Sequence, residues 1–276
     1  MNKKIAIQGI KGSFHHIATK EYFNTDTQIL SYLSFDETVN SLLKQQADQA
    51  IMAIENSIAG SIIPNYALID KHDLFISGEY YLNIQHNLMA LKGQSIEDIK
   101  EVHSHPMALL QCKDFFESYP HIKLVEDKDT AEVARRIQEG STQGIAAIAS
   151  ALAAEIFELN ILAESIQTVK NNQTRFVIVN RNKKDGQNKE DINKASLRFE
   201  LDHKRGSLAA LLNVMSDCRL NLTKIQSLPI IETPWKYAFF VDVRFDEYAH
   251  FQKAVSLIEI MAENFKLLGE YKNASL

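Results

Sequence analysis

The sequence has little of what marks several large classes of protein. Two cysteines in 276 residues, Cys112 and Cys218, are too few for a disulfide framework, so reduced and buried thiols are expected. No run approaches the ~18 apolar residues that a membrane helix needs. The apolar run at residues 5–7 is too short for a signal peptide. We therefore expect a cytoplasmic protein with no membrane partner.

The sequence also lacks a block of positive charge and a cluster of metal ligands. The net charge is −5 and no block of lysine or arginine stands out, which argues against nucleic acid as a partner. His103 and His105 lack a third ligand at suitable spacing, so no metal is expected. No serine occupies a Gly-x-Ser-x-Gly elbow, so a nucleophilic triad is not evident.

What is present is the pattern of an α/β protein followed by a smaller unit. Residues 3–157 alternate short apolar runs with amphipathic ones. Residues 180–194 are polar and highly charged, which predicts an exposed linker. Beyond them the pattern is βαββαβ, a ferredoxin-like unit too small to bury both sheet faces well, so pairing with a second copy is expected. We predict domains at residues 1–180 and 195–276, with a linker at 181–194.

Three polar clusters lie at strand ends in the first domain. They are residues 55–57 after the strand 50–54, residues 104–106 after Val102, and residues 172–176 at the start of an apolar strand. Each cluster alone could cap a helix or satisfy a turn. Because open α/β sheets bind ligands beyond the carboxyl ends of their strands, the three together predict one cleft. There Arg175 offers a fork of donors for a carboxylate, and Thr174 offers a hydroxyl.

Four further features of the first domain are considered one by one, and for two of them a structural and a ligand-binding interpretation are both open. Residues 9–14 follow a strand and precede a helix, so they form a tight turn or present amide donors to a carboxylate. Ser150 caps the helix that follows it or faces a ligand. His15 and His16 are expected on an ordinary helix surface. Gln111 lies in the helix after Pro106, which needs no glutamine for its stability.

Together these segments resemble the prephenate dehydratase family, whose members make phenylpyruvate for phenylalanine biosynthesis. The resemblance rests on residues 9–14, 53–60, 104–112, 129–131 and 172–176, whose order and spacing cover nearly all of residues 1–180. It implies two α/β lobes similar to the periplasmic binding proteins, with a cleft between them. The first lobe would hold about residues 1–77 and 166–180, and the second about residues 78–165.

The resemblance also implies a reaction. Prephenate loses carbon dioxide and water, and aromatisation drives the loss, so no metal, redox group or other cofactor is implied. Thr174 is implied as the catalytic donor to the leaving hydroxyl, with Glu55 or a water returning its proton. Arg175 would anchor a carboxylate, although a structural ion pair is the alternative. The residues implied for binding prephenate are Asn56, Ser57, Ser104, His105, Gln111, Asn172, Arg175 and Phe176.

The C-terminal unit resembles an ACT domain, the amino-acid-sensing βαββαβ module. This implies feedback by L-phenylalanine and a homodimer or homotetramer. The allosteric residues implied are Gly206, Ser207, Leu208, Asn221 and Leu222. The sequence starts with the dehydratase part, so we expect an enzyme without a fused chorismate mutase.

The chain departs from the family pattern at several positions. Ala53 stands where proline is usual, Met107 where glutamine is usual, and the first loop ends Ser-Phe-His rather than Thr-Phe-Ser. In the regulatory part, Gln226 and Leu228 replace the glutamate and arginine of a usual Glu-Ser-Arg-Pro motif. Three alternatives stay open: an arogenate dehydratase, a decarboxylase that does not aromatise prephenate, and a two-lobed aromatic-acid sensor without turnover. Retention of Thr174 favours the dehydratase over the non-aromatising decarboxylase.

Overall fold

The computed structural model describes residues 3–23, 27–183, 189–202, 204–230, 233 and 236–274. These form two compact units, one of residues 1–60 and 81–176 and the other of residues 61–80 and 177–276. The second unit thus combines the C-terminal part with a segment from the predicted first domain. The division into a catalytic domain, a linker and a regulatory domain stays a prediction. Among the described residues, no helix is both long enough and apolar enough to span a membrane.

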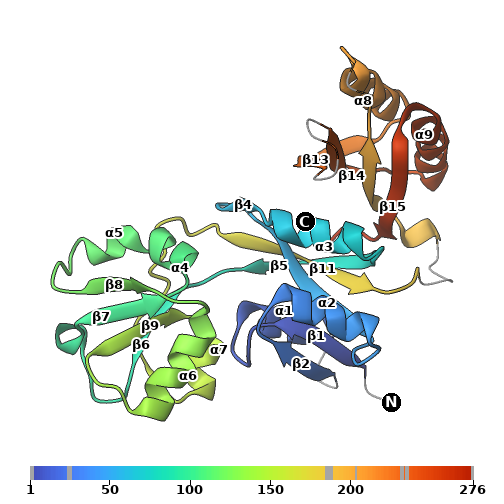
Figure 1. Cartoon of the computed structure of the whole chain (residues 1–276). Coiled ribbons are helices and arrows are strands. Elements are labelled where there is room, and N and C mark those ends of the chain that lie inside the picture. Colours follow the sequence, from blue (N-terminus) through green and yellow to red (C-terminus); the bar gives the residue numbers. More distant parts are fainter. Residues whose placement is uncertain are drawn as a thin grey trace. The chain divides into compact units, whose positions relative to one another are not determined.

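Three parallel strands begin the first unit (Figure 1). The strand β1 pairs with β2 on one side and with β3 on the other. Ser34 caps the helix α2, because its hydroxyl accepts a hydrogen bond from Glu37 N at 3.2 Å. In chain order the elements are β1 (Lys4–Gln8), α1 (Phe14–Phe23), β2 (Gln28–Tyr32), α2 (Phe35–Leu43) and β3 (Gln49–Asn56).

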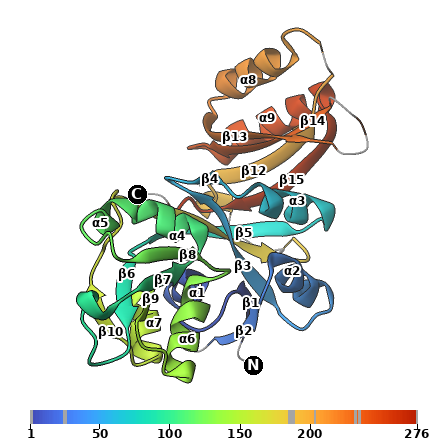
Figure 2. The ribbon, with the colours of Figure 1, turned by 60° about the vertical axis from the view of Figure 1, so that its left-hand side comes forward.

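A separate five-stranded sheet in the same unit has the order β10-β6-β9-β7-β8. Successive side chains of a strand point to opposite faces. In β9, Ala146 and Ile148 join the core under α4, while Ala147 and Ala149 join the core under α6 and α7. Figure 2 shows the helices on both faces. The elements are β6 (Asn87–Ala90), η1 (Ile96–Asp98), β7 (Glu101–Ser104), α4 (Pro106–Gln111), α5 (Lys113–Phe116), β8 (Lys123–Glu126), α6 (Thr130–Gly140), β9 (Ile145–Ala149), α7 (Ala151–Ile156) and β10 (Asn160–Ala163).

The predicted βαββαβ order is present in the second unit. Its four C-terminal strands pair antiparallel in the order β13-β14-β12-β15, and Gly269 of β15 pairs in parallel with Ile76 of β5 (Phe75–Asn83). The helices α8 and α9 lie on one face (Figure 1), where Phe199, Leu211 and Phe251 form part of the core. The elements are η2 (Lys189–Asp191), β12 (Lys194–Glu200), α8 (Ser207–Asp217), β13 (Asn221–Pro229), β14 (Tyr237–Arg244), α9 (Tyr248–Met261) and β15 (Glu263–Tyr271).

Residues 61–80 contact the opposite face of this sheet, a packing that the sequence did not predict. Tyr66 meets the ring of Phe240 edge-on, with 5.3 Å between centroids. Asp70 pairs with Arg198 at 3.2 Å and with Lys266 at 2.9 Å. The remaining elements are β4 (Gly60–Ser61), α3 (Ile63–Lys71), β5 (Phe75–Asn83) and β11 (Gln173–Asn180).

The end of the predicted linker is buried. Lys194 begins β12 and pairs with Glu79 of β5, with Nζ–Oε distances of 3.0 and 2.8 Å, and both side chains are at most 3% exposed. Ile192 is also part of the core. The polarity of this stretch predicts an exposed segment. The burial of Lys194 cannot be predicted locally, because its partner lies more than 100 residues away in the sequence. Residues 184–188 of the predicted linker lie outside the described residues.

Candidate active site

The amide of Asn56, at the end of β3, joins that strand to the start of β11. Its Nδ2 atom donates to Asn172 Oδ1 at 2.7 Å and to Thr174 Oγ1 at 3.0 Å. Its Oδ1 atom accepts from the backbone N–H groups of Ile58 at 3.0 Å and Ala59 at 2.9 Å. The side chain is thereby held in one orientation by its own turn, with its donor directed at Thr174.

Gln111 and His86 extend this network. Gln111 Oε1 accepts from Asn172 Nδ2 at 2.9 Å and lies 3.0 Å from His86 Nε2. Gln111 Nε2 lies 3.5 Å from Asn56 Oδ1, which closes a ring of amides. The sequence reasoning included four of these five residues and missed His86. The signal that could have found it is a single titratable side chain inside the mainly apolar extended segment of residues 82–91.

Three other predicted site residues use their side chains to hold the backbone. Ser57 Oγ accepts from Gln173 N at 2.9 Å, which ties the end of β3 to β11. Ser104 is fully buried, and its Oγ donates to Ile148 O at 2.7 Å. The exposed His105 caps α4, where its Nδ1 accepts from Met107 N at 3.2 Å.

Glu55, Arg175 and Phe176 are placed by strand alternation. Neighbouring residues of a strand point to opposite faces, so Arg175 leaves β11 on the face opposite Thr174. Glu55 likewise leaves β3 on the face opposite Asn56. Arg175 is 5% exposed and Phe176 is 1% exposed. The catalytic role of Glu55 and the anchoring role of Arg175 stay predictions.

The expectation for His15 and His16 is wrong, because both are buried. His15 Nε2 accepts from Ala53 N at 3.2 Å, and its ring packs edge-on against Phe176, with 5.0 Å between centroids. Burial lowers the pKa of His15 to about 3. Burial, with two lysines nearby, lowers the pKa of His16 to about 4. Both rings are therefore neutral at neutral pH.

The loop of residues 9–14 is closed by α7. Gly12 has a φ of +89°, and a Cβ atom there would lie 2.9 Å from Ala153 Cα, so only glycine fits. Ser150 both caps α7, accepting from Ala153 N at 3.0 Å, and donates to Gly12 O at 2.6 Å. Asp129 lies near the other end of the loop, where burial raises the pKa of its carboxyl. The loop is thus a rigid turn with an acid beside it.

The hydrogen-bonded side chains of Asn56, Asn172, Thr174, Gln111 and His86 are called the amide network below, and this network carries no formal charge. Burial lowers the pKa of His86 to about 4, against the opposing hydrogen bond of Gln111, so its imidazole is neutral at neutral pH. Within the described ranges, no three His, Cys, Asp or Glu side chains are grouped so that they could hold a metal ion. The arrangement offers hydrogen-bond donors and acceptors to an oxygen-rich ligand.

A model of the family described as prephenate dehydratase matches residues 5–184. This chain belongs to the prephenate dehydratase family. The match includes Asn56, Gln111, Asn172 and Thr174 of the amide network.

Two curated relatives align with nearly the whole chain. A bifunctional chorismate mutase/prephenate dehydratase of Buchnera aphidicola is 33% identical over 97% of this chain and 70% of its own length. An arogenate dehydratase/prephenate dehydratase of Arabidopsis thaliana is 34% identical over 97% of this chain and 72% of its own.

Two solved structures are similar over almost the full length. One is a prephenate dehydratase from Arthrobacter aurescens in complex with L-Phe, with a TM-score of 0.89, 25% identity, and coverage of 98% of this chain and 90% of that one. The other is GqqA, described as a novel type of quorum quenching acylase, with a TM-score of 0.89, 27% identity, and coverage of 99% and 98%. The family fold is therefore shared by proteins named for different reactions.

Proposed function

We propose that this chain is a carbon–oxygen lyase that converts prephenate to phenylpyruvate. The observation that carries the proposal is the hydrogen bond from Asn56 Nδ2 to Thr174 Oγ1. A hydroxyl has one proton and two lone pairs, so a threonine that accepts from Asn56 keeps its own proton available for a substrate oxygen. A hydroxide leaving group needs that donor.

The proposed step balances without an external oxidant. The bond from the ring carbon to the carboxyl group breaks and carbon dioxide leaves. The electron pair moves through the ring and expels the ring hydroxyl, which takes a proton from Thr174 and leaves as water. A bound water returns a proton to Thr174, and the proposed part of Glu55 runs through that water, because Glu55 leaves β3 on the face opposite Asn56. The neutral amides of Asn56, Gln111 and Asn172 orient the substrate. Arg175 is proposed to hold a carboxylate from the face of β11 opposite Thr174.

The same groups suit arogenate, which the Arabidopsis relative carries in its name. An acylase reaction would need a base that activates a nucleophile or water. Thr174 Oγ1 has an amide donor as its partner among the described contacts, and His86 Nε2 is occupied by Gln111. These contacts favour dehydration over acyl transfer.

Turnover of prephenate by the purified chain tests the proposal, read as phenylpyruvate absorbance in alkali. Thr174→Ala should lower kcat by about 100- to 10,000-fold, the range for loss of a general acid. Thr174→Ser keeps the hydroxyl and should retain far more activity. Product from arogenate alone would reassign the substrate. Near-normal turnover by Thr174→Ala would refute the mechanism, and ligand binding without turnover by the parent would indicate a sensor.

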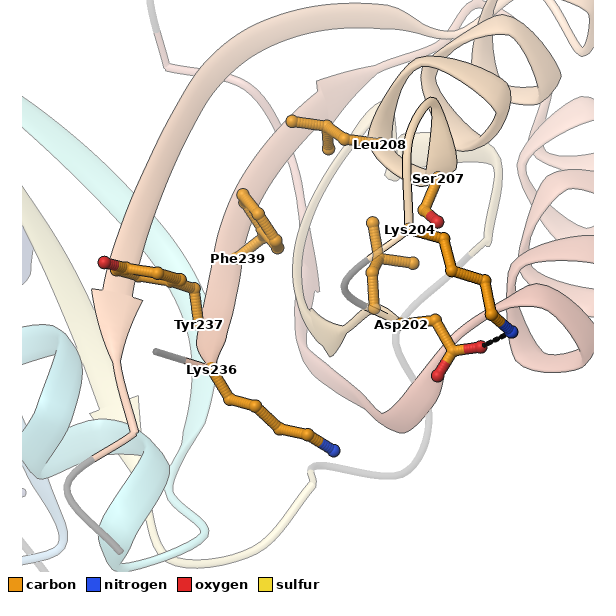
Figure 3. Close-up of a pocket in the computed structure, with 8 residues that line it drawn as sticks. Asp202, Lys204, Ser207, Leu208, Lys236, Tyr237 and Phe239 are labelled. Atoms are coloured by element: carbon orange, nitrogen blue, oxygen red, sulfur yellow. Dashed lines mark hydrogen bonds and ion pairs between the residues drawn. The ribbon is translucent and has the colours of Figure 1, made fainter. Parts of the chain in front are cut away.

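Feedback by L-phenylalanine at the ACT-like unit is part of the same proposal. A pocket of about 150 Å³ lies at the start of α8, within the second unit. Figure 3 shows the side chains that line it. Ser207 and Leu208 line it, as predicted allosteric residues would. Phe239 and Tyr237 offer aromatic surface, while Asp202 and Lys236 offer charges of both signs. Such a lining suits an amino acid with an aromatic side chain.

Of the other predicted allosteric residues, Gly206 directly precedes α8, whereas Asn221 and Leu222 lie at the start of β13. Asn221 and Leu222 pair with Arg244 and Val243, at the end of β14 opposite Tyr237. At ~3.3 Å per strand residue the two groups are roughly 20 Å apart, too far to share one phenylalanine within a chain. The proposed homodimer or dimer of dimers would bring the two groups together from different copies of the chain.

Sedimentation and calorimetry test this regulation. We expect a dimer or tetramer at micromolar concentration that binds L-phenylalanine more tightly than millimolar. Leu208→Asp should abolish that binding without abolishing basal turnover. A monomer, or a parent that binds L-phenylalanine no tighter than millimolar, would contradict the proposal. The measurement also shows whether binding survives the replacement of the usual glutamate and arginine by Gln226 and Leu228.

The finer features of the fold and setting are proposals too. We propose that the first 180 residues form the two lobes of a periplasmic-binding-protein-like cleft, and that the unit after residue 194 is an ACT domain. Both cysteines are free and buried, which supports a cytoplasmic location, where thiols stay reduced.

A further inference from the structure

The ring of His86 is buried beside the amide network. The residue is 3% exposed, and its backbone N–H donates to Gln167 Oε1 at 2.9 Å. Phe14 meets the ring edge-on, with 5.5 Å between centroids. Among the described residues, Nε2 has Gln111 Oε1 as a partner, whereas Nδ1 is buried and has none. The ring is thus placed for one hydrogen bond.

The direction of that bond follows from the backbone. Ile58 N and Ala59 N can only donate, so the Asn56 atom that accepts from them is Oδ1, and Nδ2 faces Asn172. Asn172 must then present Oδ1 to Asn56 and Nδ2 to Gln111. Gln111 presents Oε1 in turn, and His86 Nε2 must carry the proton that it donates.

We propose that His86 is a positioning residue that, by donating from Nε2, fixes the amide orientation of Gln111 and through it the network that directs Asn56 at Thr174. The inference rests on the proposed dehydratase function. If the amide of Gln111 were flipped, its NH2 group would face two donors, His86 Nε2–H and Asn172 Nδ2. His86 and the backbone of residues 58–59 therefore hold the two ends of one oriented chain of hydrogen bonds.

A double-mutant cycle with Gln111 separates positioning from packing. His86→Leu should lower kcat/KM for prephenate about tenfold, mostly in kcat, and His86→Gln, which keeps a donor near Nε2, should recover most of the loss. In a Gln111→Ala background, His86→Leu should cost less than about twofold more, because its partner is already gone.

Gln167→Met is the matched control. It removes the acceptor of the His86 backbone N–H but leaves the hydrogen bond between the His86 ring and Gln111. Its effect should therefore add to that of Gln111→Ala. If His86→Leu also adds fully to Gln111→Ala, His86 acts only through packing and the proposal is overturned. His86→Gln as inactive as His86→Leu would overturn it too.

The tautomer provides a readout that does not need turnover. The 15N spectra of histidine-labelled parent and His86→Gln protein identify the His86 signal as the one that the variant lacks. That signal should have the chemical shifts of a neutral ring protonated at Nε2. A ring protonated at Nδ1 would overturn the inference even if prephenate is turned over. An Nε2–H ring in a protein that does not act on prephenate would leave the hydrogen bond intact and refute the proposed function instead.

Discussion

At the scale of residues, two departures from the family pattern compensate for each other. Proline is usual at the position of Ala53 and serine at that of His15. A proline has no N–H, whereas Ala53 N–H donates to His15 Nε2 at 3.2 Å. The histidine that replaces serine thus accepts the donor that the loss of proline introduces.

This pairing predicts coupled effects on stability. Ala53→Pro should destabilise the protein by about 1–3 kcal/mol, because it leaves the buried Nε2 atom of His15 without its donor. His15→Ser should destabilise it as well, since it removes the Nε2 acceptor of that hydrogen bond and the ring beside Phe176. Combined, the two changes should cost less than their sum by about 1 kcal/mol or more in urea unfolding. Additivity within ~0.5 kcal/mol would contradict the coupling.

At the scale of elements, the sequence pattern predicts whether a segment is a helix or a strand better than it predicts the residues at which that element begins and ends. Pro106 begins a helix as predicted, but the helix is interrupted at Cys112, where α4 ends and α5 begins at Lys113. Periodicity does not reveal such a break, because both pieces bury side chains against the same core. The polar stretch before residue 195 predicts a linker that includes Lys194, because lysine is usually a surface residue, whereas Lys194 begins β12 and is buried.

The partner segment explains that error. Lys194 is stabilised by Glu79, and neither is exposed to solvent. A buried charge requires a partner, and Glu79, from the segment of residues 61–80 that belongs to the same compact unit as β12, supplies it. No local pattern around residue 194 contains this information.

At the scale of the whole molecule, three buried neutral histidines make stability depend on pH. The pKa values of His15, His16 and His86 are lowered from 6.5 to about 3, 4 and 4. The unfolded chain binds protons below pH 6.5 and the folded chain does not until about pH 4. Stability is therefore complete above pH 6.5 and falls as the pH is lowered from there.

Each histidine contributes a slope of up to about 1.4 kcal/mol per pH unit. The urea midpoint should drop clearly between pH 7 and pH 5, a range above the ordinary carboxylate pKa values. The double variant His15→Ser, Ala53→Pro, which removes one of the three groups, should have a shallower slope. A midpoint that stays constant over this range would contradict the neutral burial of these rings.

How much of the site could be predicted depended on how local its signals are. Asn56, Gln111, Asn172 and Thr174 stand in recognisable segments, and the structure brings them together. Ser104 stands in such a segment too, yet its hydroxyl is used inside the fold. His86 stands in none of the segments that carried the resemblance, and the direction of its hydrogen bond depends on three other elements.

The sequence by itself determined the family, the alternation of helices and strands, the βαββαβ order and the positions of the polar strand ends, because these are properties of local spacing. Only the tertiary structure decided which groups are buried and what they contact. The neutral rings of His15, His16 and His86, the Lys194–Glu79 pair and the packing of α3 against the C-terminal sheet all depend on partners distant in sequence. Burial decides whether a polar side chain is solvated or must be paired, and burial is a property of the folded chain alone.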